Sequence, residues 1–476
     1  MVMNNRIIWI VMMIQLYCSV AFTQKQILPK PNKHQLAWHE MEFYLFVHFG
    51  PNTFTGLEWG HGDEAEAIFN PTQLDCNQWA RTAKASGAKG IIITAKHHDG
   101  FCLWPSQYSK HTVRESIWKN GQGDVLKELS EACKSHGLKF GVYISPWDRN
   151  HPEYGTPKYN DIYINTMKEI FDRYSPIWEL WWDGANGEGP NGKKQVYDFA
   201  LFEREMRKIS RSTVIFSDIG PDIRWIGNER GIVGDPNWNY LDTTGFKRGH
   251  GAPHVDTLNH GNYNGRHWIP GECDVSIRPG WFYHKEEDDR VKSAEQLFNL
   301  YLKSVGRGAN LLLNVPPDPR GLIHTTDSTA LIQFKKLIDQ SFAQNLLQTS
   351  MVKMDGDRKT RAAFLNYSSF LQKAKRVNSN MPTLRFELKK EAFINCLVLQ
   401  ETIIDGQFIR SFKVELYHSG VLIKTVEGSS IGRKRILTFP GEQVDQVKII
   451  CSGTSDQLNL QNVAAYHIAE QLLEKK

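Results

Sequence analysis

The sequence predicts a parallel α/β barrel of the (β/α)8 TIM type, followed by a C-terminal β-sandwich. Between about residues 43 and 315, continuous apolar runs of strand length alternate with helical stretches. Such runs are typical of a parallel sheet that helices cover on both faces. A closed barrel is favoured over an open doubly wound sheet, because no glycine-rich phosphate loop follows the first strand. After about residue 350, short strand-like runs recur between Gly, Ser and Pro, as in a sandwich. We expect the barrel domain over residues 24–345 and the sandwich over residues 350–476.

The first 23 residues predict a secretory signal peptide. Arg6 is their only charge, an apolar run over residues 7–14 follows, and the small residues Ser19 and Ala21 come before the expected cleavage. The apolar run is shorter than the ~20 residues that a membrane span needs. We therefore expect a secreted or periplasmic protein with no membrane anchor after signal removal.

Composition excludes several classes of protein. Hydrophobic residues make up 41% and charged residues 23% of the 476 residues, which argues against a disordered or fibrous chain. The net charge is only +5 and no basic run could follow a phosphate backbone, so we expect no nucleic-acid partner. The 14 tryptophans predict flat apolar surfaces, for which sugar faces are one candidate.

Cysteine spacing gives no sign of a metal or redox site. Cys18 lies in the signal segment, and none of the other cysteines is in a CxxC pair. A chain of this length can be stabilised by core burial without disulfides. We expect most of these cysteines to be isolated, buried thiols.

The predicted barrel elements alternate regularly along the chain. The first strand, residues 43–48, ends at Gly50-Pro51, and the helix over residues 124–136 has Asp124 as its candidate N-cap and Gly137 after its last residue. The other expected strands are residues 90–97, 139–145, 177–183, 213–217, 274–277 and 310–315, and the other expected helices are residues 77–86, 159–174, 199–210 and 294–305.

The C-terminal part has the alternation of apolar and polar residues that is typical of β-strands. In residues 383–388 the apolar side chains of Leu384, Phe386 and Leu388 fall on one face. Further short strands are expected at residues 394–399, 412–417, 421–426, 435–439 and 447–451.

Polar side chains follow several strands of the predicted barrel, at the rim where such barrels carry their active sites. These residues are His48; His97, His98 and Asp99; Asp183, directly after Trp181 and Trp182; Asp222, Arg224, Asn228 and Glu229; Glu272, Asp274 and Arg278; and, in the loop after the first strand, Glu58 and Trp59. Each also has a structural interpretation: Asp183 could cap a helix, and Glu272 could pair with Arg278. Their convergence on one rim favours a functional site.

Three kinds of chemistry are open for this rim. A zinc site of histidines lacks the spacing of the common helical motif, and adjacent histidines such as His97 and His98 point in opposite directions at a strand end. Acyl transfer lacks a Gly-x-Ser-x-Gly elbow. Glycoside hydrolysis by two carboxylates, with histidines and tryptophans holding the sugar, fits the aromatic excess best. We therefore expect no metal and no cofactor.

Five segments in order along the chain carry a family resemblance: WHEMEFYLFVHFG at residues 38–50, EWG at 58–60, KHHDGF at 96–101, ELWWDG at 179–184 and LLLNV at 311–315. In them the sequence is similar to glycoside hydrolase family 29, the α-L-fucosidases. The resemblance covers nearly the whole mature chain and implies a retaining hydrolase of fucosylated oligosaccharides or glycoconjugates.

The resemblance also implies roles for the two carboxylates. Asp183 matches the family's nucleophile. The segments RWIGNE at residues 224–229 and ECDVSIRPGWFY at 272–283 resemble the branch associated with α-1,3- and α-1,4-linked fucose. In that branch Glu229 is the acid/base, with Glu272 as the reserve candidate. A retaining pair of carboxyl groups lies roughly 5–5.5 Å apart.

The other rim residues are expected to contact the sugar. The resemblance implies that His48, His97, His98, Glu58 and Trp59 bind its hydroxyl groups, that Arg224 and Glu272 also bind substrate, and that Trp182, Phe101 and Trp281 form a wall for the 6-methyl group of fucose. Of the two neighbouring tryptophans, Trp181 is expected in the barrel wall. Because an apolar wall discriminates only modestly per methyl, hydrogen bonds should supply most of the selectivity.

Alternative functions remain open at this point. The chain could be a broad-specificity α-L-fucosidase with Glu272 as acid/base, a non-catalytic fucose-binding protein, or a retaining glycosidase of another sugar such as galactose. The sandwich could bind carbohydrate, lend a loop to the rim or brace the barrel, and we favour bracing.

Overall fold

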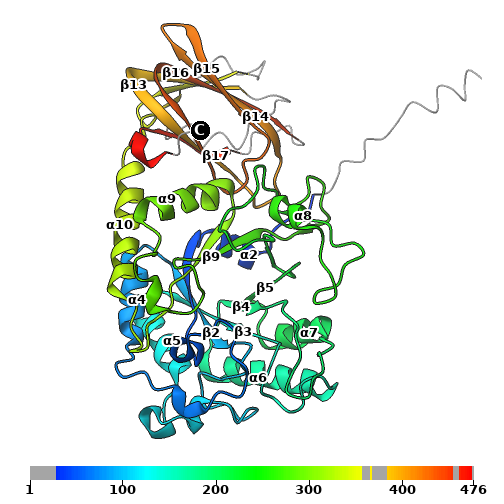
Figure 1. Cartoon of the computed structure of the whole chain (residues 1–476). Helices are drawn as coiled ribbons and strands as arrows, with labels where there is room; N and C mark the ends of the chain where they lie inside the picture. Colours follow the sequence, from blue (N-terminus) through cyan, green and yellow to red (C-terminus); the bar gives the residue numbers. More distant parts are fainter. Residues whose placement is uncertain (1–27, 356–364, 367–382, 454–459, 474–476) are drawn as a thin grey trace, which may run out of the picture.

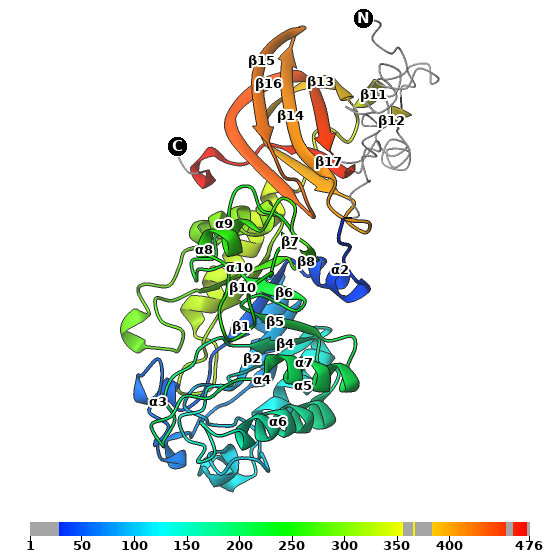
Figure 2. The same cartoon turned by 90° about the vertical axis from the view of Figure 1, so that its right-hand side faces the viewer.

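A closed parallel barrel carries an antiparallel sheet domain at one end (Figures 1 and 2). The computed structural model describes residues 28–355, 365–366, 383–453 and 460–473. The predicted signal peptide lies outside the described residues. The two-part architecture confirms the predicted fold class.

The barrel closes through eight parallel strands in the order β1-β10-β9-β6-β5-β4-β3-β2. Strands such as β1 and β2 are buried at every position, which explains their continuous apolar sequence. The strands are β1 (Phe43–Val47), β2 (Gly90–Lys96), β3 (Lys139–Ile144), β4 (Glu179–Trp182), β5 (Val214–Ser217), β6 (Ile223–Trp225), β9 (Gly271–Ser276) and β10 (Asn310–Asn314).

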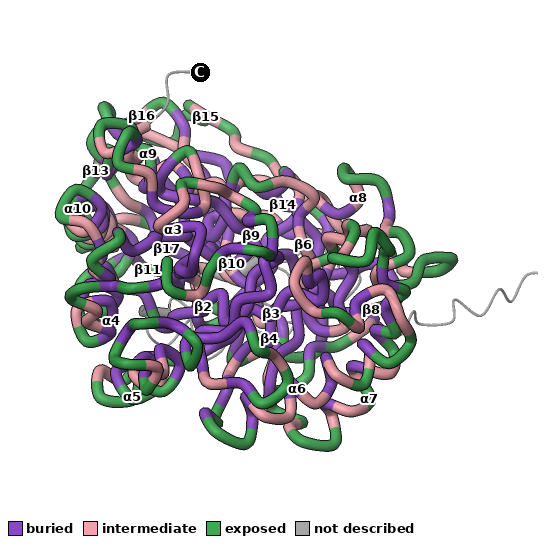
Figure 3. The backbone as a smooth tube through the Cα atoms, turned by 60° about the horizontal axis from the view of Figure 1, so that its bottom comes forward, coloured by how far each residue is buried: buried purple, intermediate pink, exposed green. Residues whose placement is uncertain are grey.

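Helices surround these strands, and the buried barrel forms the centre of the molecule (Figure 3). The helix α5 begins and ends as predicted: the Asp124 side chain accepts a hydrogen bond from the amide of Lys127, and Gly137 follows with φ of 68°. The main helices are α4 (Cys76–Ala85), α5 (Val125–His136), α6 (Lys158–Tyr174), α7 (Phe199–Ile209), α9 (Ala294–Lys303) and α10 (Thr325–Ser341), and shorter ones are α2 (Lys33–His39), α3 (Asn52–Thr55) and α8 (Val255–His260).

The strand β6 was not among the predicted strands. It pairs in parallel with β5, and residues 218–222 join the two strands without a helix. A groove of about 870 Å³ lies beside this connection, lined among others by Phe199, Ile219 and Phe246. None of the predicted site residues lines this groove.

In the C-terminal domain, neighbouring predicted strands prove to be parts of longer ones. Residues 383–388 and 394–399 both belong to β13, which bends at register shifts between Glu387 and Ala392 and between Ile394 and Cys396. The strands are β11 (Met351–Asp355), β12 (Leu365–Asn366), β13 (Thr383–Glu401), β14 (Ile409–His418), β15 (Val421–Gly428), β16 (Arg435–Gly453) and β17 (Leu460–Tyr466). One connected sheet therefore encloses a single apolar core, to which both ends of β13 contribute.

The sheet domain is attached to the barrel by buried and charged contacts. Ile436 belongs to the same apolar core as the barrel strands. Lys434 pairs with Glu42 at 2.7 Å, and Arg435 pairs with Asp235 at 2.6 Å. These contacts are what a bracing domain requires.

The cysteine prediction is confirmed for the described residues: Cys76, Cys102, Cys133, Cys273, Cys396 and Cys451 are all free and buried. Within the described ranges, no helix combines the length and the apolar character needed to cross a bilayer.

Candidate active site

A small cavity lies at the C-terminal end of the barrel strands, which we call the barrel mouth. Its volume is about 140 Å³. It brings together most of the predicted site residues, namely His48, Glu58, Trp59, His97, His98, Asp183, Glu229 and Trp281. Phe46, Tyr143, Trp181, Ala185 and Asp274 complete its lining.

Asp183 follows the last residue of β4 and is held by two donors. The Tyr143 hydroxyl donates to Oδ2 at 2.7 Å, and the backbone amide of Ala185 donates to Oδ1 at 2.7 Å. The side chain keeps 23% of its surface exposed. This carboxylate is therefore fixed in direction but open to the cavity.

Glu229 reaches the cavity from the loop after β6. Burial raises the pKa of its carboxyl group, and the negative charges of Asp183 and Glu58 raise it further. The Trp281 indole N–H donates to Oε2 at 3.2 Å and opposes this shift. Glu229 therefore holds a proton more readily than an ordinary glutamate.

His48 has a defined tautomer. Its Nδ1 lies 2.9 Å from Asn314 Oδ1, while the Asn314 amide group donates to Ser276 Oγ at 2.9 Å and to the Trp281 carbonyl at 2.7 Å. Because Asn314 presents an acceptor, His48 must carry its proton on Nδ1. Burial lowers the pKa of His48 to about 3, so the ring is neutral.

His97 and His98 both line the cavity, with ring centroids 4.2 Å apart, so the expectation that they point in opposite directions is wrong. Strand alternation does not apply to them, because both follow the last residue of β2. Burial, together with the neighbouring histidines, lowers the pKa of His97 well below its usual value. Its buried Nδ1 has no hydrogen-bond partner among the described residues. His97 lines the cavity, but this nitrogen is itself buried, so the rest of the ring forms the part of the wall that a ligand would meet.

Glu58 joins two loops of the mouth. Its carboxylate accepts from the amide of Trp281 at 2.8 Å and pairs with His284 Nε2 at 2.6 Å. The adjacent Trp59 is 57% exposed and meets the His98 ring edge-on at 5.8 Å. An exposed tryptophan over a polar cavity is a suitable platform for a sugar face.

Comparison with known proteins identifies the family. The family model described as alpha-L-fucosidase matches residues 34–340. The chain is 42% identical over 422 residues to alpha-L-fucosidase 1 of Arabidopsis thaliana, which covers 87% of this chain and 82% of the relative. The chain belongs to the α-L-fucosidases of glycoside hydrolase family 29.

Solved structures agree with this membership. A glycoside hydrolase 29 family member from an unknown rumen bacterium is 37% identical with a TM-score of 0.82, covering 93% of this chain and 78% of that one. The Ruminococcus gnavus GH29 fucosidase in complex with fucose is 29% identical with a TM-score of 0.84, and the match covers 94% of this chain and 96% of that one. The chain is thus a glycoside hydrolase, and the alternative of a non-catalytic binding protein is set aside.

The two neighbouring tryptophans of this α-L-fucosidase have each other's predicted positions: Trp182 lies in the barrel wall and Trp181 at the cavity. Trp182 is fully buried behind β4 beside Phe199 and Phe202, and its indole N–H points at Met167 Sδ. Trp181 lines the cavity instead. Successive side chains of a strand face opposite sides, so only one of the two can face the barrel interior. The prediction that Trp182 contacts the sugar is wrong.

Arg224 does not reach the cavity either. It is fully buried, and its guanidinium donates to the carbonyls of Leu258 at 2.8 Å and Trp238 at 3.2 Å, to the carbonyl of Ile269, and to Asn237 Oδ1 at 3.0 Å. These bonds brace the long segment between β6 and β9. The predicted substrate-binding role of Arg224 is therefore replaced by a structural one.

Glu272 lies inside the barrel, outside the cavity lining. It is fully buried, accepts from the Trp181 indole at 2.9 Å and is hydrogen-bonded to the Tyr44 hydroxyl. Since it stands near the start of β9, at the end away from the mouth, it cannot protonate a leaving group there. Both its substrate-binding role and its reserve role as acid/base are corrected. Phe101, proposed for the methyl wall, is buried against Phe69.

Sequence reasoning missed several lining residues. Phe46 shares strand parity with His48, so the alternation of β1 could have identified it. Tyr143 and Trp181 occupy inward positions on β3 and β4. Both are uncharged at neutral pH, whereas the predicted site residues are mainly charged side chains and histidines. Asp274 appeared among the rim residues without a role. It is buried, and the Trp225 indole donates to Oδ1 at 3.1 Å.

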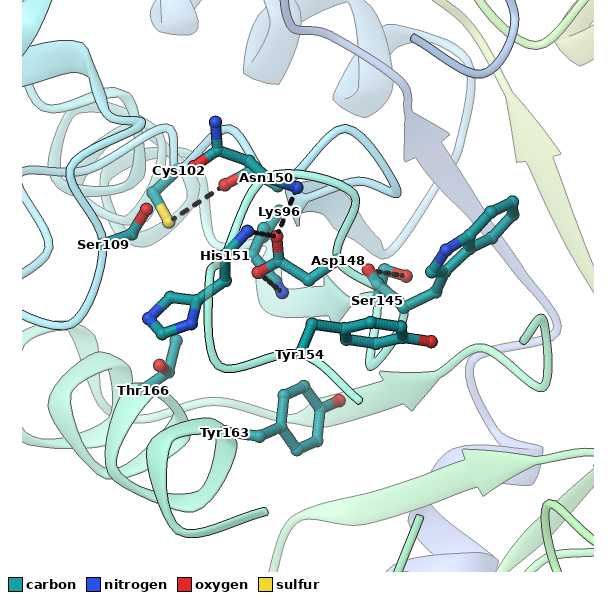
Figure 4. Close-up of polar contacts among 12 residues, drawn as sticks. Lys96, Cys102, Ser109, Ser145, Asp148, Asn150, His151, Tyr154, Tyr163 and Thr166 are labelled. Carbon is teal, nitrogen blue, oxygen red and sulfur yellow. Dashed lines mark hydrogen bonds and ion pairs between the residues drawn. The ribbon is translucent and has the colours of Figure 1, made fainter. Parts of the chain in front are cut away.

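A buried ion pair between Lys96 and Asp148, shown in Figure 4, adjoins the histidines in the sequence through Lys96. Lys96, which precedes His97 directly, lies 2.8 Å from Asp148 Oδ2, and both side chains are less than 5% exposed. The Tyr159 hydroxyl also donates to Asp148, at 3.0 Å. The Lys96 charge lowers the pKa of Asp148 to about 2 despite the opposing effect of burial. The ion pair between Lys96 and Asp148 therefore fixes the backbone directly before His97 and His98.

Proposed function

We propose that this α-L-fucosidase is a retaining exo-enzyme in which Asp183 is the nucleophile and Glu229 the acid/base. The observation that carries the proposal is that these two carboxyl groups line one small cavity in unlike environments. Asp183 accepts two hydrogen bonds, whereas burial raises the pKa of Glu229. A carboxylate fixed in direction as the nucleophile and a second carboxyl group that holds its proton as the acid are what double displacement needs.

In the first step, an Asp183 oxygen attacks C1 of the fucosyl residue. The glycosidic C1–O bond breaks, and Glu229 gives its proton to the departing oxygen. The products are a β-fucosyl ester of Asp183 and the free acceptor. The fixed direction of Asp183, set by Tyr143 and Ala185, keeps the attacking atom aligned.

In the second step, Glu229 works as a base. Its carboxylate takes a proton from water while the water oxygen attacks C1. The ester bond to Asp183 breaks, and the carboxylate and α-fucose are released. Two inversions at C1 give net retention.

The size of the cavity supports action on a terminal sugar. A volume of about 140 Å³ is well below the roughly 300–1,000 Å³ typical of pockets for larger ligands. One monosaccharide would lie among Asp183, His48 and His97, with the acceptor outside. Phe46 and Trp281, whose ring centroids are 6.3 Å apart, offer an apolar surface for the methyl group.

The stereochemical outcome tests the mechanism. An aryl α-L-fucoside would be hydrolysed in an NMR tube and the first sugar product observed before mutarotation. We expect α-fucose to appear first. Initial release of β-fucose would contradict the retaining mechanism, and cleavage of aryl α-galactosides with equal efficiency would contradict selectivity for fucose.

For linkage, we propose a preference for α-1,3- and α-1,4-linked fucose. The support is the sequence of residues 224–229 and 272–283, which resembles the branch with that preference, together with the position of Glu229 in the first of these segments. Fucosyl oligosaccharides with 2-, 3- and 4-linkages would be compared as substrates. Faster hydrolysis of the 2-linked substrates would overturn the assignment.

We also propose that the natural substrate is a fucosylated glycan met outside the cytoplasm. The support is the signal-like composition of residues 1–23. Sequencing the N-terminus of the exported protein would test this, and an intact Met1 in a cytoplasmic fraction would refute it.

A further inference from the structure

The hydrogen bonds around His98 define which of its nitrogens carries a proton. The ring is buried and has contacts at both nitrogens. Nδ1 lies 2.7 Å from Ser145 Oγ, and Nε2 lies 3.7 Å from Asp183 Oδ2. The first contact is a hydrogen bond, whereas the second is too long for one.

Ser145 can only accept from His98. Its hydroxyl has one proton, and it lies 2.9 Å from the carbonyl oxygen of Trp147. A carbonyl has no proton to give, so Ser145 must donate in that contact. The proton shared with His98 therefore belongs to Nδ1. In Figure 4 Ser145 lies to the right of the buried pair formed by Lys96 and Asp148.

The charges around His98 favour a neutral ring. Burial lowers its pKa, as do the cations of Lys96 and Arg149, while Asp183 raises it. A neutral ring with its proton on Nδ1 has a lone pair on Nε2. That lone pair faces the lone pairs of Asp183 Oδ2 across a gap of 3.7 Å.

Two acceptors facing each other repel unless a proton lies between them. Tyr143 already donates to Asp183 Oδ2, but from its own side, at 2.7 Å. The remaining gap suits one hydroxyl donor beside the reacting carbon. The opposite tautomer, with the proton on Nε2, would direct its N–H toward Asp183, and a small movement of the ring would then let it donate to Asp183 and weaken it as a nucleophile.

We propose that Ser145 is a positioning residue that holds His98 in its Nδ1–H tautomer, so that Nε2 and Asp183 Oδ2 together receive a sugar hydroxyl. The inference rests on the proposed role of Asp183 as nucleophile. It assigns Ser145 no contact with substrate. Its effect passes entirely through the orientation and protonation of His98.

Kinetics provide the first test. Ser145→Ala should lower kcat/KM for an aryl α-L-fucoside about tenfold, mainly through kcat, because His98 is then free to donate to Asp183. Ser145→Thr keeps the hydroxyl and should stay within about threefold of the wild type. Unchanged kinetics in Ser145→Ala would overturn the proposal.

A matched control separates this effect from loss of stability. Ser116 is also buried, and its hydroxyl donates to the Val113 carbonyl at 2.7 Å, away from the cavity. Ser116→Ala should lower the melting temperature about as much as Ser145→Ala but leave kcat/KM and its pH profile unchanged. Equal kinetic losses in both variants would reduce Ser145 to a structural role.

A spectroscopic readout tests the tautomer directly. Enzyme labelled with 15N-histidine would be examined by long-range 15N–1H correlation, with the His98 signals assigned as those missing from His98→Gln. We expect an Nδ1–H pattern in the wild type and its loss in Ser145→Ala. An Nε2–H or doubly protonated pattern in the wild type would refute the proposal. Because this signal needs no turnover, it stays distinct from a failure of Asp183 as nucleophile.

Discussion

Two pairs of carboxyl groups lie in the same barrel at different depths. At the mouth, Asp183 and Glu229 line the cavity. In the interior, Glu179 and Glu272 are both fully buried at the starts of β4 and β9. Burial raises the pKa of Glu179 well above its usual value and also raises that of Glu272, and the charge of Glu272 raises that of Glu179 further. The inner pair therefore keeps protons that an exposed pair would lose.

The difference teaches that depth along a strand, more than residue type, decides what a carboxyl group can do. Glu179 and Asp183 are four residues apart, about 13 Å at the usual rise of a strand. Asp183 is partly exposed and has two donors, so it can act as a charged nucleophile. Glu179 has no exposed surface, so the same chemistry is closed to it.

The largest expected effect is at the mouth. Asp183→Ala should lower kcat for an aryl α-L-fucoside by about 10⁴-fold or more, because the covalent intermediate cannot form. Folding should persist, as judged by circular dichroism and melting temperature. Added azide should restore turnover with β-fucosyl azide as product. Near-normal activity would show that the carboxyl groups at the mouth are no more important for catalysis than those in the interior.

The next largest effect distinguishes Glu229 from Glu272. Glu229→Ala should lower kcat about 10²–10⁴-fold on an oligosaccharide and less on an activated aryl fucoside, whose leaving group needs little protonation. Azide should rescue this variant with α-fucosyl azide, since it replaces water on the fucosyl-enzyme. Rescue seen only in Glu272→Ala would transfer the acid/base role to the interior and invalidate the argument from depth.

The sequence contains enough information to predict which side chains of a barrel strand face the interior and which face the helices. Asp183 was placed at the mouth, and Trp181 shares its parity, so Trp181 should have been assigned to the interior and Trp182 to the outer wall. The cavity confirms this assignment. The eight predicted site residues that line the cavity are those that follow clear strands or belong to distinctive segments.

Depth could not be predicted, because it depends on where a strand begins. Residues 274–277 were expected as a strand, but β9 begins at Gly271. The shift places Glu272 inside the barrel and Asp274 at the cavity. The three residues of β6 are too few to give a periodic signal, so the outward direction of Arg224 had no sequence signature.

A smaller effect concerns stability and the inner pair. In the folded chain Glu179 keeps its proton above the pH at which the unfolded chain loses it. The folded state then binds more protons, so this group's contribution to stability falls as pH rises from about 4.3 toward the raised pKa. Glu179→Gln removes that dependence, and its free energy of unfolding relative to the wild type should increase with pH by up to about 1.4 kcal/mol per pH unit.

Melting temperatures between pH 5 and 8 would measure this difference. Glu387, which is exposed on β13, provides Glu387→Gln as a control for the same substitution at the surface. Parallel curves for Glu179→Gln and the wild type would mean that the interior does not hold its proton.

The smallest expected effect is at Asp274, which lies between the two pairs in depth. It lines the cavity, yet burial and the charges of Glu229 and Glu272 raise its pKa well above the usual value. If burial dominates, Asp274 works as a neutral hydrogen-bonding group. Asp274→Asn should then stay within about threefold of the wild type in kcat/KM, with the same pH profile. Asp274→Ala should lower kcat/KM more than Asp274→Asn does, because the Trp225 indole then loses its hydrogen-bond acceptor. A loss of about a hundredfold in Asp274→Asn would mean that a third charged carboxylate serves the reaction, and that exposure to the cavity outweighs burial.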